Sequence, residues 1–236
     1  ETHGWVPSTQ HIIIMAQANY LRLGDACPDF EADSTEGKIS FHKWAGDSWV
    51  IFFSHPADYT PVCTTELGTV AKYGDQWKAR GVKPIAISVD PVDSHNGWLK
   101  DIEETQGTKM NFPIVADPTR AIANSYGMLA PNAEDTMKGK LTVRSVFIID
   151  PAKKLRLTLT YPAATGRNFD ELIRVIDALQ LTDGSKVATP ANWKQGDDVV
   201  ILPGINDEKA KEMFTDFKTL KPYLRMTKQP AKTVKK

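Results

Sequence analysis

Cysteine is scarce in this chain of 236 residues, which contains only Cys27 and Cys63. Two cysteines cannot build the disulfide framework of a secreted scaffold, so we expect a reducing compartment such as the cytoplasm. Lys and Arg (29) balance Asp and Glu (29), which leaves no net charge to recruit nucleic acid or an anionic membrane. No apolar run approaches the roughly 20 residues that a membrane-spanning helix needs.

Motifs for cofactors are missing as well. The sequence has no glycine-rich phosphate loop, and its five histidines show no metal-ligand spacing, so we expect no cofactor and no metal. There is no Cys-x-x-Cys pair, because Thr64, Thr65 and Glu66 follow Cys63. Met15 looks like a natural start, and residues 1–18 are therefore predicted to be a leader or a disordered N-terminus.

Strand-like and helix-like patterns alternate along most of the chain. Buried strands are predicted at 49–53, 83–89 and 112–116, and two further strands at 144–150 and 155–161 form a hairpin through 151–153. Helices are predicted at 61–80, 93–105, 119–126 and 168–182. A polar loop is predicted at 128–139. This order predicts an α/β fold, with a central mixed β-sheet flanked by helices on both faces.

The composition shifts after Asp183 and Gly184. The remaining segment contains a predicted strand at 199–202 and a predicted helix at 207–217. We therefore expect residues 184–236 to form a small C-terminal domain behind a larger domain at 19–183.

The most informative stretch is residues 54–67, which follow the first strong strand. Thr60 and Pro61 are typical of an N-cap and of the first position of a helix. Cys63 would then lie in the first helical turn, where free N–H groups and the helix dipole favour negative charge. A thiol in that position is held partly as thiolate, which is the reactive form.

The pattern Pro56-x-x-x-Thr60-x-x-Cys63 resembles the peroxiredoxin signature, and its flanks look like the one-cysteine subfamily. The resemblance runs from about residue 21 to about residue 230. It implies a thioredoxin-like fold and a thiol peroxidase that reduces hydrogen peroxide and alkyl hydroperoxides in antioxidant defence. It also implies a homodimer or a higher oligomer, with 184–236 as the dimerisation domain.

The resemblance carries over Pro56, Thr60, Cys63 and Arg144 as the catalytic set. Complete ionisation of a thiol gains only about thirty-fold at pH 7, which is small beside the roughly 10⁶-fold or greater acceleration of an enzyme. The larger effect must be stabilisation of charge on the departing oxygen as the O–O bond breaks. Arg144 would supply that charge, Thr60 would hold the peroxide, and Pro56, which has no N–H, would limit access of water.

Three further residues are predicted to support this set. Glu66, three residues after Cys63, would hold an arginine in place, and Arg167 resembles the second arginine of the family. An ordinary ion pair between these two is the alternative. His55 would hydrogen-bond near the sulfur, or else serve as a structural histidine. Cys27 is expected to be a small buried apolar side chain rather than a redox partner.

No cysteine follows Cys63, so the C-terminal resolving cysteine of two-cysteine relatives is missing. We therefore expect that Cys63 becomes sulfenic acid and that an external thiol, glutathione or a thioredoxin-like protein, reduces it.

The sequence leaves two other activities open. Residues 46–49 are similar to the serine motif of phospholipase-like relatives, with Ser48 as nucleophile and His42 as base. However, Val50 stands where that motif has glycine, and the expected acid falls at Ala152, with Asp150 only nearby. A triad without its orienting acid loses much of its rate. A holdase chaperone role of the oligomer is the second alternative.

Overall fold

The computed structural model describes residues 21–129 and 140–231, so the leader predicted at 1–18 and most of the loop predicted at 128–139 lie outside the described residues. A seven-stranded mixed sheet forms the centre, in the order β2-β1-β5-β4-β3-β6-β7. Its strands are β1 Glu31–Ser34, β2 Gly37–Ser40, β3 Trp49–Ser54, β4 Val82–Ser88, β5 Ile114–Ala116, β6 Arg144–Ile149 and β7 Leu155–Tyr161. β3, β4 and β5 run parallel, whereas β6 pairs antiparallel with β3. The predicted mixed sheet is thus confirmed.

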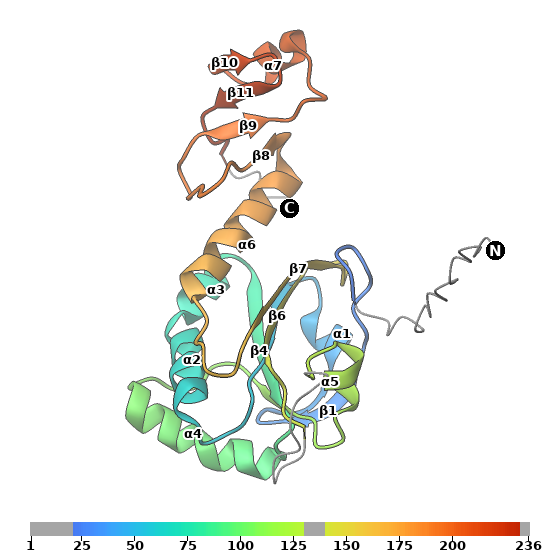
Figure 1. Cartoon of the computed structure of the whole chain (residues 1–236), viewed down its shortest axis with the longest axis vertical. Helices are drawn as coiled ribbons and strands as arrows, with labels where there is room; N and C mark the ends of the chain where they lie inside the picture. The colour runs from blue at the N-terminus through green and yellow to red at the C-terminus, as the bar shows by residue number, and fades with distance from the viewer. Residues whose placement is uncertain (1–20, 130–139, 232–236) are drawn as a thin grey trace, which may run out of the picture.

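Helices cover both faces of this sheet (Figure 1). They are α1 Phe41–Ala45, α2 Pro61–Lys72, α3 Gly74–Ala79, α4 Val92–Gln106, α5 Ala121–Ser125 and α6 Phe169–Gly184. Side chains of β3 alternate between the two faces. Ile51 and Phe53 pack with residues of α2, α4 and α6, whereas Val50 and Phe52 pack with residues of α1 and α5. The almost continuously apolar sequence of β3 follows from this burial on both sides.

The prediction of a single helix at 61–80 is wrong, because the chain forms α2 and α3 with a break at Tyr73. Side chains bind two carbonyls at the end of α2: Trp77 Nε1 donates to Val70 O (2.9 Å), and Asn111 Nδ2 donates to Ala71 O (2.9 Å). The Tyr73 N–H is shared between the carbonyls of Thr69 and Val70. Side-chain donors that enter the backbone ladder in this way interrupt a helix.

The β6–β7 hairpin is confirmed, and it fixes where Arg144 lies. Phe53 of β3 is paired with Val146 of β6 in antiparallel register. The N-terminal end of β6 therefore lies beside the C-terminal end of β3, where the loop to α2 begins. Arg144, the first residue of β6, is buried at this edge of the sheet.

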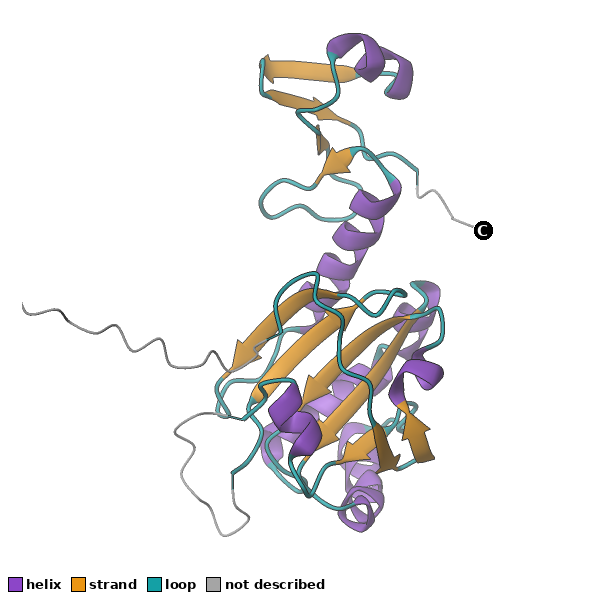
Figure 2. Cartoon of the chain, turned by 90° about the vertical axis from the view of Figure 1, so that its right-hand side faces the viewer, coloured by secondary structure: helices purple, strands orange, loops and turns teal. Residues whose placement is uncertain are grey.

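Helix α6 begins at the predicted cap, because the Asn168 side chain accepts hydrogen bonds from the N–H groups of Asp170 and Glu171 (3.0 and 3.3 Å). Its far end leads to a second, four-stranded sheet in the order β10-β11-β9-β8 (Figure 2). The elements there are β8 Val187–Ala188, β9 Val199–Ile201, α7 Asp207–Met213, β10 Phe217–Lys221 and β11 Leu224–Thr227. They enclose a separate apolar cluster around Trp193.

Two predictions for this C-terminal segment need correction. The helix predicted at 207–217 ends at Met213, because Phe214 is extended (φ −129°, ψ 122°) and buried in the small cluster. Phe217 then pairs with Thr227 and starts β10, a strand that the sequence did not reveal because most of its side chains are exposed. Among the described residues, no helix combines the length and the apolar character needed to cross a membrane.

The two-sided burial of β3 gives a stability prediction. Phe52 is fully buried, and its ring centre lies between 5.0 and 6.3 Å from the ring centres of Phe30, Phe41, Tyr126 and Phe147. We expect Phe52→Ala to lower the free energy of unfolding by about 3–5 kcal/mol, because it removes buried surface and leaves a cavity. Urea denaturation measures this change. The control Lys100→Ala, at an exposed helix position, should cost less than about 0.5 kcal/mol. Equal losses in the two variants would contradict the assignment of Phe52 to the core.

Candidate active site

Cys63 lies where the strand, the loop and the helix of residues 54–67 meet. β3 ends at Ser54, and α2 begins with Pro61 after an extended Thr60 (φ −119°, ψ 146°), as predicted. The Thr60 side chain makes no capping hydrogen bond, however, and its hydroxyl donates to the Ala57 carbonyl (2.8 Å). Cys63 therefore occupies the first turn of an intact helix. Its side chain is fully buried.

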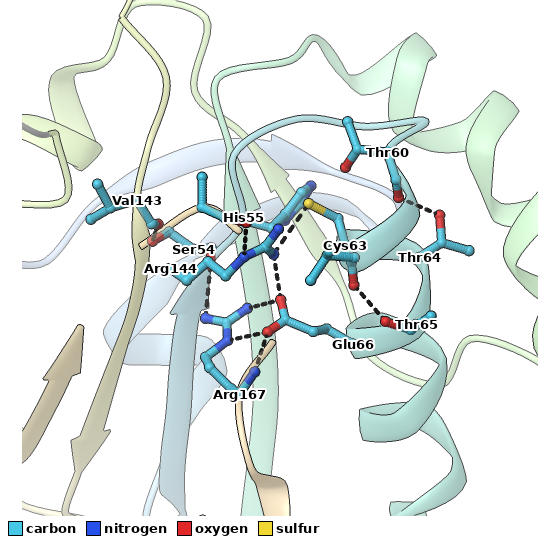
Figure 3. A network of polar contacts seen from close by, with 12 residues as sticks. Ser54, His55, Thr60, Cys63, Thr64, Thr65, Glu66, Val143, Arg144 and Arg167 are labelled. Atoms are coloured by element: carbon cyan, nitrogen blue, oxygen red, sulfur yellow. Dashed lines mark hydrogen bonds and ion pairs between the residues drawn. The ribbon is translucent and has the colours of Figure 1, made fainter. Parts of the chain in front are cut away.

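Arg144 reaches this sulfur from the opposite side of the site. Its Nη1 lies 3.4 Å from Cys63 Sγ, although the two residues are 81 positions apart in the chain. The same Nη1 donates to Glu66 Oε2 (2.7 Å), and Nε donates to the Ala163 carbonyl (2.8 Å). Figure 3 shows the guanidinium between the sulfur and the carboxylate. A fixed positive charge is thus placed beside the thiol.

Glu66 joins two arginines. Its Oε1 accepts from Arg167 Nε (2.9 Å) and from the Arg167 backbone N–H (2.8 Å), while Oε2 accepts from Arg167 Nη2 (2.7 Å) and from Arg144. Burial disfavours the charged carboxylate. The hydrogen bonds and charges of the two arginines outweigh burial and hold the pKa of Glu66 below its ordinary value. Glu66 is therefore an anion that fixes both guanidinium groups.

Arg167 donates to Glu66 and to two backbone carbonyls, but it does not donate to Cys63. Its Nη1 donates to the carbonyls of Ser54 (2.8 Å) and Ser145 (3.0 Å), which lie at adjacent ends of β3 and β6. Its guanidinium carbon lies 5.1 Å from the centre of the Phe53 ring. Burial lowers the pKa of Arg167, but Glu66 compensates part of this effect. Two arginines and one glutamate leave one surplus positive charge beside the Cys63 sulfur.

His55 does not hydrogen-bond to the sulfur within the described structure. Its Nε2 lies 3.0 Å from Asp58 Oδ1, and its Nδ1 is buried without a hydrogen-bond partner. Burial lowers the pKa of His55, which keeps the ring neutral, although Asp58 opposes this shift. The sequence interpretation missed Asp58 and its second partner, His95. Asp58 lies inside the recognised motif, but nothing in the sequence relates it to His95, 37 residues later.

The loop before the helix is fastened to the strand that carries Arg144. Ser54 Oγ donates to the Val143 carbonyl (2.5 Å), and Thr142 Oγ1 donates to the His55 carbonyl (2.6 Å). Pro56 is buried in the same loop. The structure therefore joins four predicted side chains, those of Cys63, Glu66, Arg144 and Arg167, in one buried network. The other three, His55, Pro56 and Thr60, lie in the loop before the helix, where His55 contacts Asp58.

Cys27 lies in the apolar cluster on the other face of the central sheet from Cys63, and both thiols are free. Burial raises the pKa of Cys27 to about 12, so its reactive thiolate is scarce at neutral pH. These features fit the predicted role of a buried apolar side chain.

The residues of the phospholipase-like alternative do not form a hydrogen-bonded triad in the described structure. His42 Nε2 contacts the Cys27 carbonyl (3.0 Å), and its Nδ1 lies 3.8 Å from Asp29. No hydrogen bond joins His42 to Ser48 in the described part of the chain, and Ala152 lies in the turn between β6 and β7. This geometry gives no support to a nucleophilic serine.

Comparison with known proteins agrees with the geometry. The AhpC/TSA family matches residues 23–158, and the C-terminal domain of 1-Cys peroxiredoxin matches residues 178–216. A 1-Cys peroxiredoxin of Dictyostelium discoideum is 54% identical, covering 91% of this chain and 88% of its own length. Peroxiredoxin-6 of Gallus gallus is 52% identical over 89% of this chain and 98% of its own length.

Solved structures show the same fold. A cysteine-to-serine mutant of peroxiredoxin 6 from Arenicola marina superposes with a TM-score of 0.86 at 49% identity, over 89% of this chain and 99% of that one. A yeast mitochondrial 1-Cys peroxiredoxin gives a TM-score of 0.81 at 47% identity, over 88% of this chain and 99% of that one. The predicted thioredoxin-like fold is confirmed. With a buried cysteine beside a fixed guanidinium and this degree of similarity over nearly its whole length, the chain belongs to the 1-Cys peroxiredoxins of the AhpC/TSA family and is a thiol-dependent peroxidase.

Proposed function

We propose that Cys63 is the residue that reduces the peroxide. The observation that carries this proposal is the position of its sulfur in the first turn of α2, 3.4 Å from Arg144 Nη1. The thiolate attacks one oxygen of the peroxide, and an S–O bond forms as the O–O bond breaks. The sulfur is oxidised to sulfenic acid, and the other oxygen leaves as hydroxide or alkoxide, which takes a proton to become water or alcohol.

Arg144, Thr60 and Pro56 have separate roles in this step. Arg144 stabilises the thiolate before attack and the negative oxygen that develops during it. The Thr60 hydroxyl already donates to Ala57, so its lone pairs remain to accept a hydrogen bond from the peroxide. Pro56 is buried and has no N–H to bind water. Glu66 and Arg167 act as positioning residues, since they hold Arg144 through the carboxylate that they share.

An external thiol then regenerates the enzyme. It attacks the sulfenic acid to form a mixed disulfide and water, and a second thiol releases the Cys63 thiol and departs in a disulfide. Cys27 lies on the other face of the sheet and is not the resolving residue. The yeast relative is described as resolving its thiol via glutathione/thioredoxin systems. This supports glutathione or a thioredoxin-like protein as the reductant here. We further propose a reducing compartment such as the cytoplasm, because the chain has only two cysteines and both are free.

The chain is further proposed to act as a homodimer, or a higher oligomer, through its C-terminal part. The boundaries we propose are residues 19–183 for the peroxidase domain and 184–236 for the dimerisation domain. Large apolar side chains are exposed on the small C-terminal unit: Met213 is 42% exposed, Leu220 is 46% exposed and Tyr223 is 73% exposed. Burial of such side chains is the usual driving force for association.

The role of Cys63 predicts a contrast between the two cysteines. Cys63→Ser should abolish peroxide consumption in the presence of a thiol reductant, because a serine hydroxyl does not form the sulfenic acid. Cys27→Ser should leave turnover nearly unchanged, because Cys27 lies on the other face of the sheet from Cys63. Mass spectrometry of peroxide-treated protein should find sulfenic and then sulfinic acid on Cys63. A dominant disulfide between Cys27 and Cys63 would reject the mechanism.

The role of Arg144 predicts that its removal slows the oxidation of Cys63 by peroxide. Arg144→Gln should slow formation of the sulfenic acid by about 10²–10³-fold, the usual effect of removing a group that stabilises a developing oxyanion. Rapid-mixing measurement of single-turnover oxidation tests this. Arg156→Gln is the matched control, because Arg156 lies on the neighbouring strand β7 and pairs with Asp183 instead. Comparable slowing in both variants would show that the effect is not specific to Arg144.

The position of Glu66 predicts a pH-dependent loss of stability in Glu66→Gln. Because the pKa of Glu66 is lowered in the folded protein, its contribution is full above the ordinary value of about 4.3 and is lost as the pH falls through the folded value. At pH 7 the variant should be about 3–5 kcal/mol less stable, since two buried arginines lose their shared anion. Urea unfolding should show the difference narrowing below about pH 4. In Glu171→Gln, which removes an exposed partner of Arg174, the loss should stay below about 1 kcal/mol. A deficit in Glu66→Gln that is independent of pH would contradict the charge argument.

A further inference from the structure

Asp58 connects the loop before Cys63 to helix α4. Its carboxylate accepts hydrogen bonds from three side chains: His55 Nε2 at 3.0 Å, His95 Nδ1 at 2.7 Å and Ser94 Oγ at 2.8 Å. Ser94 and His95 belong to α4, which packs against α2. The side chains of His55, Asp58 and His95 are completely buried. These hydrogen bonds therefore hold the loop before Cys63 in place, and they are separate from the network of Arg144 and Glu66.

Both ring nitrogens of His95 face hydrogen-bond acceptors. Its Nδ1 faces the Asp58 carboxylate, and its Nε2 faces the Val115 carbonyl at 3.2 Å. A carbonyl oxygen and a carboxylate anion both only accept, so the His95 ring is enclosed between two acceptors. Burial disfavours the Asp58 anion, but the hydrogen bonds from the two histidines outweigh burial and hold the pKa of Asp58 well below its ordinary range. The geometry thus places a buried histidine directly against a buried carboxylate.

The loop that this pair holds is strained. Tyr59, which follows Asp58, has a φ of +56°, in the left-handed region that bulky residues avoid. Its side chain is 54% exposed, with its ring centre 6.2 Å from that of Trp98. Residues in such a conformation persist only where the surroundings impose it. Asp58 on one side and the start of α2 on the other impose it here.

We propose that the buried hydrogen bond between His95 and Asp58 is a latch that holds the strained loop closed over Cys63 and sets how often an external thiol reaches the sulfur. The proposal rests on the proposed function, in which an external thiol must reach this residue. Cys63 is fully buried, so a glutathione-sized molecule cannot contact it while the loop is closed. His95 acts through Asp58 and is a positioning residue.

The distances between His55, Asp58 and His95 fit hydrogen bonds better than ligation of a metal ion. Atoms of His55, Asp58 and His95 that could ligate a metal all lie within 4.8 Å of one another. Zinc ligands at about 2.0–2.1 Å in a tetrahedron lie about 3.3 Å apart. The observed separations of 2.7 and 3.0 Å from Asp58 are instead those of hydrogen bonds to a charged group. Besides the two histidines, Asp90 faces Asp58, and its carboxylate accepts the Asp58 backbone N–H (2.9 Å).

Access to Cys63 tests the latch itself. In a Cys27→Ser background, a bulky aromatic disulfide reagent should react with Cys63 at least about tenfold faster in His95→Asn, since the Asp58 carboxylate loses a buried hydrogen-bond partner. Ser94→Ala is the matched control, because it removes a neutral hydrogen bond from the same carboxylate. It should raise the rate by less than about fivefold. Faster hydrogen exchange at residues 55–60 should accompany the change in His95→Asn.

Either of two results would reject the latch: unchanged reaction of Cys63 in His95→Asn, or equal acceleration in His95→Asn and Ser94→Ala. Neither measurement uses peroxide turnover. A failure of the latch is therefore distinguishable from a failure of Cys63 as the peroxide-reducing residue, which the Cys63→Ser assay reports.

Discussion

The carboxylate of Glu66, shared by two buried arginines, is the interaction on which the site depends. Removing a guanidinium from water costs several kcal/mol, and only a well-placed anion with good hydrogen bonds recovers that cost. Glu66 supplies it to Arg144 and Arg167 together, and one positive charge remains uncompensated. That surplus faces the Cys63 sulfur at 3.4 Å. The reactivity proposed for Cys63 thus depends on this charge balance, with the helix terminus as a smaller contribution.

The sheet makes this charge cluster possible, because its strand ends supply rigid carbonyl acceptors for arginine N–H groups that Glu66 does not bind. Arg167 binds carbonyls at the paired ends of β3 and β6, and it stacks on Phe53. Arg144 starts β6 and is anchored by the carbonyl of Ala163. These contacts restrain both guanidinium groups, so the positive charge stays in place when the peroxide arrives. Such preorganisation is what makes electrostatic catalysis effective.

In the proposed mechanism, burial of the Cys63 sulfur favours its reaction with peroxide and hinders its reaction with the thiol reductant. An enclosed site strengthens each charge interaction with a small peroxide. A thiol reductant is much larger and needs the loop to open. The positive φ of Tyr59 and the hydrogen bonds of Asp58 both belong to this loop, which is closed for the first step and must open for the second. A strained segment held by a few defined contacts can open without unfolding the sheet beneath it.

The sequence alone determined most strands of the central sheet and the longer helices, and it pointed to Cys63 as the candidate reactive residue, because these depend on local patterns. The apolar run of β3, the Thr60–Pro61 helix start and the hairpin at residues 144–161 each follow from neighbouring residues. The break at Tyr73 was missed because it depends on Asn111, a side chain far along the chain. The same reason applies to the pairing of Asp58 with His95. Only the tertiary structure decided which charges meet behind Cys63, since a contact between residues 81 or 101 positions apart is a product of packing and leaves no periodic trace in the sequence.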